Sequence, residues 1–225
     1  MVFYNESGKR VVYDCTNRIG GELYGDVYKL SEEECIKICK DKNEAPDKEV
    51  LMLIRSLMLK NYYEIYDLLY RKNGVLKAYT MKYYKNEDID ILTMPTEYTL
   101  DNLYNLYTSV EKLTKNNIFI SDMHTGNIIL SSDKITVIDV DLYTINKYYN
   151  SRGLRTKNSL ALEYLFREIF LEALNEYHIE YPRTARDTIT ELFTSYSGNI
   201  EEKVCKELST SKYPIDYVRK KIKNR

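Results

Sequence analysis

A change of hydrophobic pattern along this chain of 225 residues limits the folds open to it more than any other feature. Over residues 1–84, short segments alternate between apolar and polar residues, as β-strands do. After about residue 98, apolar residues recur every three or four positions, as in helices that bury one face. The polar stretch between these parts, residues 85–97, is typical of a linker. We therefore expect one α+β domain, with a small antiparallel sheet and one helix before the linker and a mostly helical region, 98–225, after it.

The strands and the first helix can be placed from local signals. Five segments have strand character: 11–13, 27–30, 35–39, 62–70 and 75–84. The first three are expected to form antiparallel strands with tight connections, and the last two a hairpin that turns at Gly74. The many tyrosines of this hairpin are expected to pack on strand faces. Asp47 is placed to cap a helix in which apolar residues recur from Val50 to Leu57.

The second half of the chain is expected to contain two long helices and one more hairpin. One helix follows Thr99, the hairpin joins residues 128–130 to 135–138, and the second helix spans 159–174. This second helix is apolar on nearly every side, so we expect it to be buried at the centre of the helical region. The basic residues of 219–225 are expected to be a solvated, frayed end, with contact to an acidic partner as the alternative.

Composition excludes several classes of function. The 33 basic and 34 acidic residues leave no positive excess for nucleic-acid binding, and two histidines are too few for a polyhistidine metal site. The four cysteines lack CxxC spacing, which fits reduced thiols in a cytoplasmic protein. The chain shows neither a signal peptide nor an apolar run of membrane-spanning length. We expect a cytoplasmic location, with secretion into a host cytosol as an effector as the alternative.

Three polar residues between apolar segments point to the chemistry. Asp122 is followed five residues later by Asn127, and Asp139 comes at the end of the next apolar strand. All three fall on turns that flank predicted strands. Phosphoryl transfer uses such groups: one carboxylate accepts a hydroxyl proton, while an amide and a second carboxylate hold Mg²⁺ against the phosphates.

The segment 122–127, Asp-Met-His-Thr-Gly-Asn, resembles the catalytic loop of the protein-kinase-like superfamily in its DLHxGN form. The resemblance implies that Asp122 is the catalytic base and that Asn127 and Asp139 bind Mg²⁺. It also implies a two-lobed protein-kinase-like fold with a shortened helical second lobe, as in compact, atypical bacterial or effector-type kinases. The DLHxGN form is also common in small-molecule kinases.

Upstream motifs follow in the order of that family. Residues 19–27 resemble its glycine-rich phosphate loop, with Gly20 and Gly25 at the first and third glycines. Lys37 matches the strand lysine that holds the α- and β-phosphates. The resemblance implies that Glu49, at the start of the following helix, pairs with Lys37, although Glu44 lies nearby in the sequence.

The resemblance also implies an adenine pocket, and hence ATP as the phosphoryl donor. Val27 would cover the base, Cys35 would line the ceiling of the pocket and Ile129 its floor. Residues 81–84 resemble the gatekeeper and hinge, which would place Met81 and Tyr83 beside the base. Core packing alone would give the same apolar pattern at Cys35 and Ile129.

Several positions depart from the family pattern. Glu22 replaces the middle glycine, and Ser121 replaces the arginine before the catalytic aspartate, so activation by loop phosphorylation is not expected. Asp141 replaces a glycine, where it either assists a second metal ion or caps a turn. His124 takes the place of a lysine near the transferred phosphate, with a structural hydrogen bond as the alternative. His178 is expected at the surface.

We therefore expect an ATP- and Mg²⁺-dependent phosphotransferase that acts on a Ser/Thr hydroxyl of a protein. Only 86 of the 225 residues follow Asp139, which leaves little room for the helical insertions that form acceptor pockets in many small-molecule kinases. A small-molecule kinase of the aminoglycoside, sugar or choline type is one alternative. A pseudokinase that binds a partner protein is another; Glu22 and Ser121 motivate it, and the intact set of predicted catalytic residues opposes it.

Overall fold

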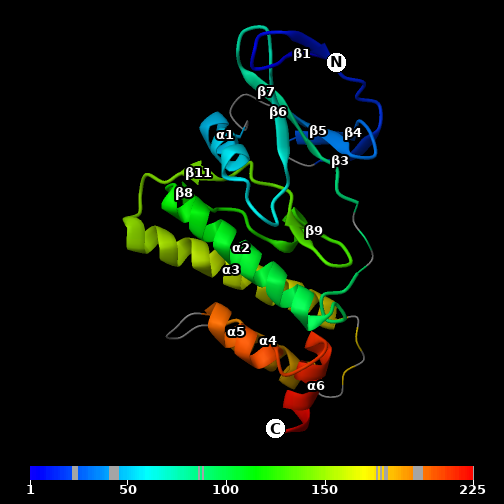
Figure 1. The fold of residues 1–225 in the computed structure, drawn as a ribbon, viewed down its shortest axis with the longest axis vertical. Helices are drawn as coiled ribbons and strands as arrows, with labels where there is room; N and C mark the ends of the chain where they lie inside the picture. Colours follow the sequence, from blue (N-terminus) through cyan, green and yellow to red (C-terminus); the bar gives the residue numbers. More distant parts are fainter. Residues whose placement is uncertain are drawn as a thin grey trace.

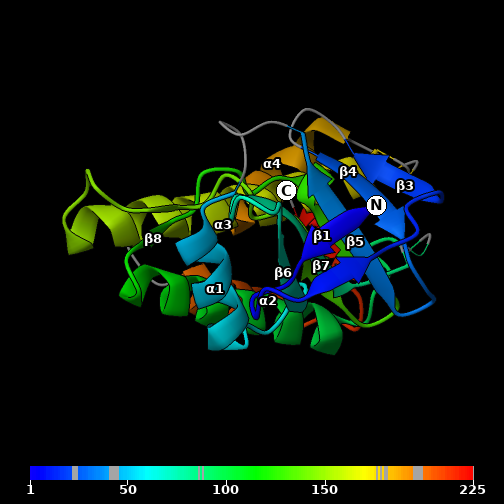
Figure 2. The same cartoon turned by 90° about the horizontal axis from the view of Figure 1, so that it is seen from above.

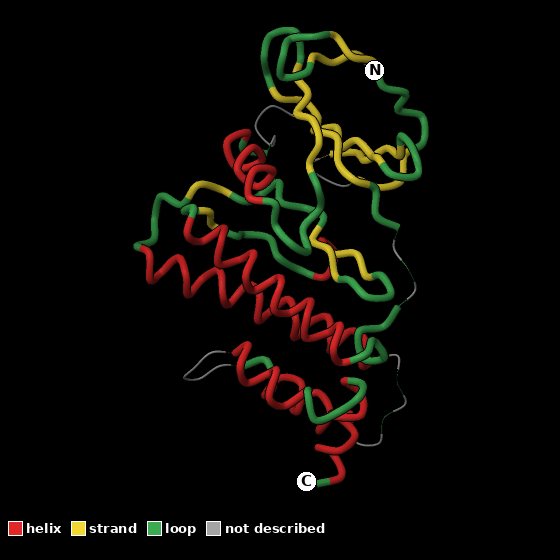
Figure 3. Tube along the Cα trace, in the orientation of Figure 1, coloured by secondary structure: helices red, strands yellow, loops and turns green. Residues whose placement is uncertain are grey.

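Strands gather at one end of the computed structural model and helices at the other (Figure 3). The structure describes residues 1–21, 25–40, 46–85, 87, 89–175, 177, 179, 182–194 and 200–224, without the side chains of residues 200 and 201. A seven-stranded sheet with one helix beside it precedes the helical region in the sequence. This arrangement confirms the expected α+β architecture.

The strand region is one antiparallel sheet in the order β2-β1-β6-β7-β5-β4-β3 (Figure 1). The bounds of its strands are β1 Val2–Tyr4, β2 Arg10–Val12, β3 Arg18–Gly21, β4 Gly25–Lys29, β5 Glu34–Cys39, β6 Ile65–Tyr70 and β7 Leu76–Lys82. The predicted tyrosine-rich hairpin is confirmed, because β6 pairs with β7 and the chain turns at Gly74, whose φ is 77°. β5 and β7 lie side by side within the sheet, which places Lys37 away from its edges.

The prediction that residues 11–13 form a strand next to 27–30 is wrong. β2 pairs with β1 on the opposite side of the sheet, where Val11 faces Phe3, and β3 is the strand that precedes and pairs with β4. A tight turn joins β1 to β2, since the N–H of Asn5 donates to the carbonyl of Lys9 at 2.9 Å. Strand propensity identifies a strand, but turn geometry selects its neighbour.

Helix α1, Lys48–Leu57, lies to one side of the strands when the molecule is seen from above (Figure 2). Its predicted cap is confirmed, because the Asp47 carboxylate accepts hydrogen bonds from the backbone N–H groups of Glu49 and Val50 at 2.8 and 3.5 Å. Val50 and Ile54 are buried, as the helical spacing predicts.

The rest of the chain is mostly helical. The bounds of its elements are α2 Thr96–Lys115, β8 Ile118–Phe119, η1 Thr125–Asn127, β9 Ile128–Leu130, β10 Ile135–Val137, β11 Thr144–Ile145, α3 Ser151–Leu174, α4 Pro182–Leu192, α5 Ile200–Leu208 and α6 Pro214–Lys223. The predicted hairpin is confirmed as the pair β9–β10. Helix α2 begins at Thr96, before the expected Thr99, because the N–H of Thr96 bonds to the carbonyl of Lys212 in the carboxy-terminal part of the chain. None of the described helices has the length and apolar character needed to cross a bilayer.

Helix α3 departs from its prediction in length and burial. It begins at Ser151, where the Asn150 side chain accepts a hydrogen bond from the N–H of Gly153. It is not buried on every side, since Leu160 and Tyr164 are 50% and 47% exposed. Helix α3 packs beside α2 (Figure 1), so one face of α3 joins the core and the other remains at the surface.

The described part of the basic end, residues 219–224, is not frayed, and Arg225 lies outside the described residues. This part belongs to helix α6, in which Ile215, Tyr217 and Val218 are buried, and Lys221 pairs with Glu207 on α5 at 2.8 Å. The basic residues therefore occupy the solvent side of an amphipathic helix that is fixed by its apolar face. An acidic partner for these residues stays a prediction.

One hydrophobic cluster connects the sheet with the helical region. It contains Leu51 of α1, Leu106 of α2 and Phe170 of α3. Backbone hydrogen bonds cross the same boundary, because the N–H of Tyr63 donates to the carbonyl of Val137 at 2.9 Å. These contacts fix the start of β6 against β10, and so they place the residues that follow β10 opposite the sheet.

Candidate active site

A cleft of about 440 Å³ lies between the sheet and the loop around β9. Lys37 and Asp139 meet there although 102 positions separate them in the sequence. All of the predicted site residues except Glu49 line this cleft: Gly20, Gly25, Val27, Cys35, Lys37, Met81, Tyr83, Asp122, Asn127, Ile129 and Asp139. The fold thus brings together residues that sequence reasoning selected from distant motifs.

The β3–β4 hairpin forms one wall of the cleft and approaches Lys37 closely. A side chain at Gly25 would lie 3.0 Å from the carbonyl of Ile38 and 3.3 Å from Cε of Lys37. Gly21 has a φ of 126°, and a side chain there would overlap the backbone of Gly25. Gly20 has open space around it, so geometry restricts Gly21, rather than the predicted Gly20, to glycine. Glu22 lies outside the described residues, as do Glu44 and His178.

Apolar side chains form the two sides of the cleft where the base is expected. Val27 and Cys35 come from the sheet and Ile129 from β9. The Cys35 thiol is buried and donates weakly to the carbonyl of Met81 at 3.7 Å. Burial raises the pKa of Cys35 to about 12, so this thiol is a neutral packing group and not a nucleophile. An apolar slot of this kind suits a planar ring.

The segment after β7 borders the same slot. The N–H of Tyr83 already donates to the carbonyl of Glu33 at 2.8 Å. The ring of Tyr83 is covered by the Lys29 ammonium, 4.7 Å from its centroid. Because the Tyr83 N–H is engaged within the protein, it is not available to a base bound in this slot.

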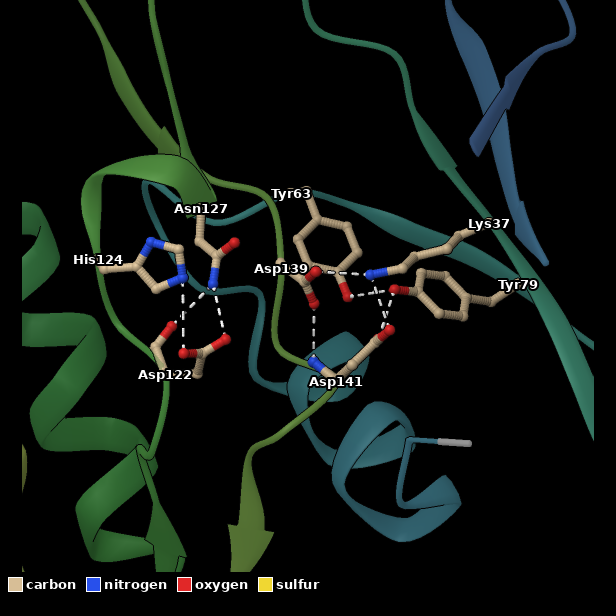
Figure 4. A network of polar contacts seen from close by, with 8 residues as sticks. All are labelled: Lys37, Tyr63, Tyr79, Asp122, His124, Asn127, Asp139 and Asp141. Atoms are coloured by element: carbon tan, nitrogen blue, oxygen red, sulfur yellow. Dashed lines mark hydrogen bonds and ion pairs between the residues drawn. The ribbon is translucent and has the colours of Figure 1, made fainter. Parts of the chain in front are cut away.

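The residues predicted to form a catalytic loop are held by the short helical turn η1. The Asn127 side-chain Nδ2 donates to the carbonyl of Asp122 at 2.9 Å and to its Oδ2 at 3.1 Å. His124 caps the turn, because its Nδ1 accepts a hydrogen bond from the N–H of Gly126 at 3.1 Å, and its Nε2 lies 3.5 Å from Asp122 Oδ1 (Figure 4). The structural hydrogen bond considered for His124 is therefore present, and its ring also lines the cleft. Ser121 donates to the carbonyl of Leu142, which ties the loop to the segment after Asp139.

The ion pair predicted between Lys37 and Glu49 is not formed, although the structure describes both residues. Lys37 Nζ lies 2.6 Å from Asp139 Oδ2 and 2.7 Å from Asp141 Oδ2 (Figure 4). Glu49 is exposed in the first turn of α1, where its N–H serves the Asp47 cap. Burial acts against the ammonium, but the Asp141 and Asp139 carboxylates outweigh burial and raise the pKa of Lys37 above its usual range.

Asp141 does not cap the turn, and assistance to a second metal ion stays a prediction. Its carboxylate points back toward Lys37 and accepts a hydrogen bond from the Tyr79 hydroxyl at 2.8 Å, while the Tyr63 hydroxyl donates to that of Tyr79 at 3.4 Å (Figure 4). The turn is closed by Asp139, whose Oδ1 accepts a hydrogen bond from the N–H of Asp141 at 3.0 Å. Burial raises the pKa of Asp141, and Lys37 offsets part of that effect. Sequence reasoning missed Tyr63 and Tyr79, because they belong to no motif and differ in no visible way from the other tyrosines of this hairpin.

Asn127 and Asp139 suit Mg²⁺ as a pair of oxygen donors. Because Asp122 engages the amide nitrogen of Asn127, the amide oxygen is turned to the side on which Asp139 lies (Figure 4). The Asp139 side chain is 28% exposed and so remains open to the cleft. Within the described residues, no group of three or more His, Cys, Asp or Glu side chains could hold a metal ion. Mg²⁺ is commonly bound by one or two carboxylates together with phosphates and water, and a pair of protein ligands suffices for such a site.

A strand region and a helical region that share a cleft, with a lysine on a central strand facing two aspartates, define a two-lobed kinase-like fold. Among solved structures, the kinase PK-1 of Cydia pomonella granulovirus is similar to this chain, with a TM-score of 0.50 and 17% sequence identity. The match covers 80% of this chain and 89% of the viral chain. At this identity the likeness shows the fold. No protein-family model matches the sequence, and no curated protein sequence is significantly similar to it.

Proposed function

We propose that this protein is an ATP- and Mg²⁺-dependent phosphotransferase. The observation that carries the proposal is the gathering of Lys37, Asp122, Asn127 and Asp139 in one cleft beside an apolar slot. Lys37 would bind the donor phosphates, and Asn127 and Asp139 would hold Mg²⁺, which neutralises phosphate charge when bound. The γ-phosphorus bond to the bridging oxygen of ATP breaks as a bond to the acceptor hydroxyl forms. Asp122 accepts the hydroxyl proton, and ADP leaves.

For the acceptor, we propose a Ser/Thr hydroxyl of a protein. The surroundings of the predicted base support this choice, because the side chains of Asp122 and His124 are 36% and 48% exposed and leave the base open to a large acceptor. An acidic residue at the position of Asp141 is one reason to consider a small-molecule kinase, but its carboxylate faces Lys37 and Tyr79. That orientation removes one reason for the small-molecule alternative.

The test is a transfer assay with radiolabelled ATP and Mg²⁺. Casein and myelin basic protein are offered beside a panel of sugars, aminoglycosides and choline. Asp101→Asn, an exposed position on α2 outside the cleft, serves as a matched control with expected wild-type activity. Label on serine or threonine of the proteins supports the proposal, whereas label on small molecules alone supports the alternative acceptor. ATP binding in a thermal-shift assay without any transfer would indicate a scaffold, and the absence of both would overturn the assignment.

A further inference from the structure

The two carboxylates that contact Lys37 have different surroundings. The Asp139 side chain is 28% exposed and opens into the cleft, whereas that of Asp141 is 1% exposed. A metal ion that binds Asp139 would compete with Lys37 for it. Asp141 stays out of reach of the cleft, so its contact with Lys37 can persist when Asp139 turns to a metal.

The sheet supplies a dedicated support for Asp141. Tyr79 on β7 stands directly opposite Lys37 on β5 in the strand register. Cross-strand partners project to the same face of a sheet, and so both side chains reach Asp141 together. Burial raises the pKa of Tyr79 well above its usual range, so its hydroxyl keeps its proton and remains a donor. The Tyr63 hydroxyl donates to the Tyr79 hydroxyl, which completes the set of hydrogen bonds that supports Asp141.

From these contacts we propose that Asp141, held by Tyr79, is the positioning residue that anchors Lys37 for phosphate binding, in place of Glu49. This inference rests on the proposed function. It has a structural consequence, because the anchor belongs to the sheet and to the segment after β10, and not to α1. A displacement of α1 would leave Lys37 in place, so the helix is not a switch for the phosphate-binding lysine.

The first test follows the anchor itself, without nucleotide or metal. Acylation of Lys37 by an N-hydroxysuccinimide ester is followed by mass spectrometry, with the exposed Lys157 of α3 as the internal reference. We expect Asp141→Asn to accelerate Lys37 acylation by at least about threefold, because the buried Lys37 ammonium loses one of its two carboxylate partners. Glu49→Gln and the control Asp101→Asn should leave it unchanged.

The second test is a mutant cycle on transfer to protein. Asp141→Asn should lower kcat/KM for ATP by about 10-fold to 100-fold, and Glu49→Gln by less than about twofold. In a Lys37→Ala background, Asp141→Asn should change the residual rate by less than about twofold, because its effect runs through the lysine. A merely structural role would lower the melting temperature and the rate in both backgrounds.

The outcomes separate this inference from the proposed function. Wild-type acylation of Lys37 in Asp141→Asn, or faster acylation in Glu49→Gln, would overturn the anchor. An expected acylation pattern in a protein that transfers no phosphate would retain the anchor and overturn the phosphotransferase. If Asp141→Asn does not fold, Tyr79→Phe is measured in the same two tests instead. Its expected effects are smaller, with a change of about 3-fold in the transfer rate.

Discussion

Two polar clusters face each other across the cleft, and they differ in burial more than in chemistry (Figure 4). Around Lys37, the side chains of Asp141 and Tyr79 are buried and held by the sheet. Around Asp122, the side chains of Asp122 and His124 are 36% and 48% exposed and held by one short turn. The buried cluster can keep charges in a fixed geometry, whereas the exposed cluster can admit an acceptor. In the proposed function, positioning and reaction therefore belong to different sides of the cleft.

The largest expected effect comes from removing the residue that lies between the clusters. Asp139→Ala should reduce phosphate transfer below detection, a loss of more than about 10³-fold, because the metal loses its carboxylate ligand. The measurement is transfer from radiolabelled ATP at saturating Mg²⁺. Retained transfer in this variant would show that Asp139 is not the metal ligand.

A substitution in the exposed cluster should lower the rate of phosphate transfer and leave nucleotide binding unchanged. Asp122→Asn should lower kcat by about 10²-fold to 10⁴-fold, since the hydroxyl proton loses its acceptor. The affinity for Mg²⁺ with a non-hydrolysable ATP analogue should stay within about twofold, because the new amide oxygen at position 122 can still accept the hydrogen bond that orients Asn127. Calorimetry and single-turnover kinetics check the two parts. A large loss of nucleotide affinity would contradict the role of Asp122 as the base.

A substitution in the buried cluster should lower the free energy of unfolding. Tyr79→Phe removes one hydrogen bond to the Asp141 carboxylate and is expected to lower the free energy of unfolding by about 1.5–3 kcal/mol. Urea unfolding at pH 7 gives this value. The matched control is Tyr104→Phe, on an exposed position of α2, with an expected change below about 0.5 kcal/mol. Equal losses of unfolding free energy in Tyr79→Phe and Tyr104→Phe would contradict the expected difference between buried and exposed hydroxyl groups.

The smallest effect is expected for an exposed ion pair away from the cleft. Arg55 on α1 donates to both carboxylate oxygens of Glu6, at 2.6 and 2.9 Å. The Arg55 hydrogen bond holds the pKa of Glu6 below its usual value of 4.5, despite partial burial. Glu6→Gln should therefore lower the free energy of unfolding by less than about 1 kcal/mol at pH 7.

The pH dependence of that loss has a defined sign. A lowered carboxyl pKa contributes stability above the unfolded-state value and loses it as pH falls through the folded-state value. The difference between wild type and Glu6→Gln should therefore shrink as pH falls below 4.5. Chemical denaturation at pH 7 and in acid measures it. A difference that grows in acid would contradict the ion-pair origin.

Local signals predicted more of the fold than long-range ones. The Asp47 cap, the turn at Gly74 and the β9–β10 hairpin depend on residues close in sequence, and all three are present. The neighbour of β2 depends on the direction in which each turn sends the chain, and the prediction of that neighbour was wrong. The burial of α3 depends on the helix it packs against, so its apolar sequence overstated its burial.

The candidate site divides in the same way. Residue types and spacing selected Asp122, Asn127 and Asp139, and the resemblance to the kinase family added Lys37, because each motif is local and its residue types suit phosphoryl transfer. The partner of Lys37 was not local. Glu49 and Asp141 both offered a carboxylate, and nothing in their order along the chain distinguishes them.

The sequence by itself determined the strand and helix regions and the residues that line the cleft, since both follow from patterns a few residues long. Only the tertiary structure decided which carboxylate holds Lys37. That choice depends on burial, on the register that sets Tyr79 opposite Lys37, and on the turn at Asp139 that brings Asp141 back toward the sheet. A charge inside a protein takes the partner that packing places within hydrogen-bond distance, and packing is a property of the whole fold.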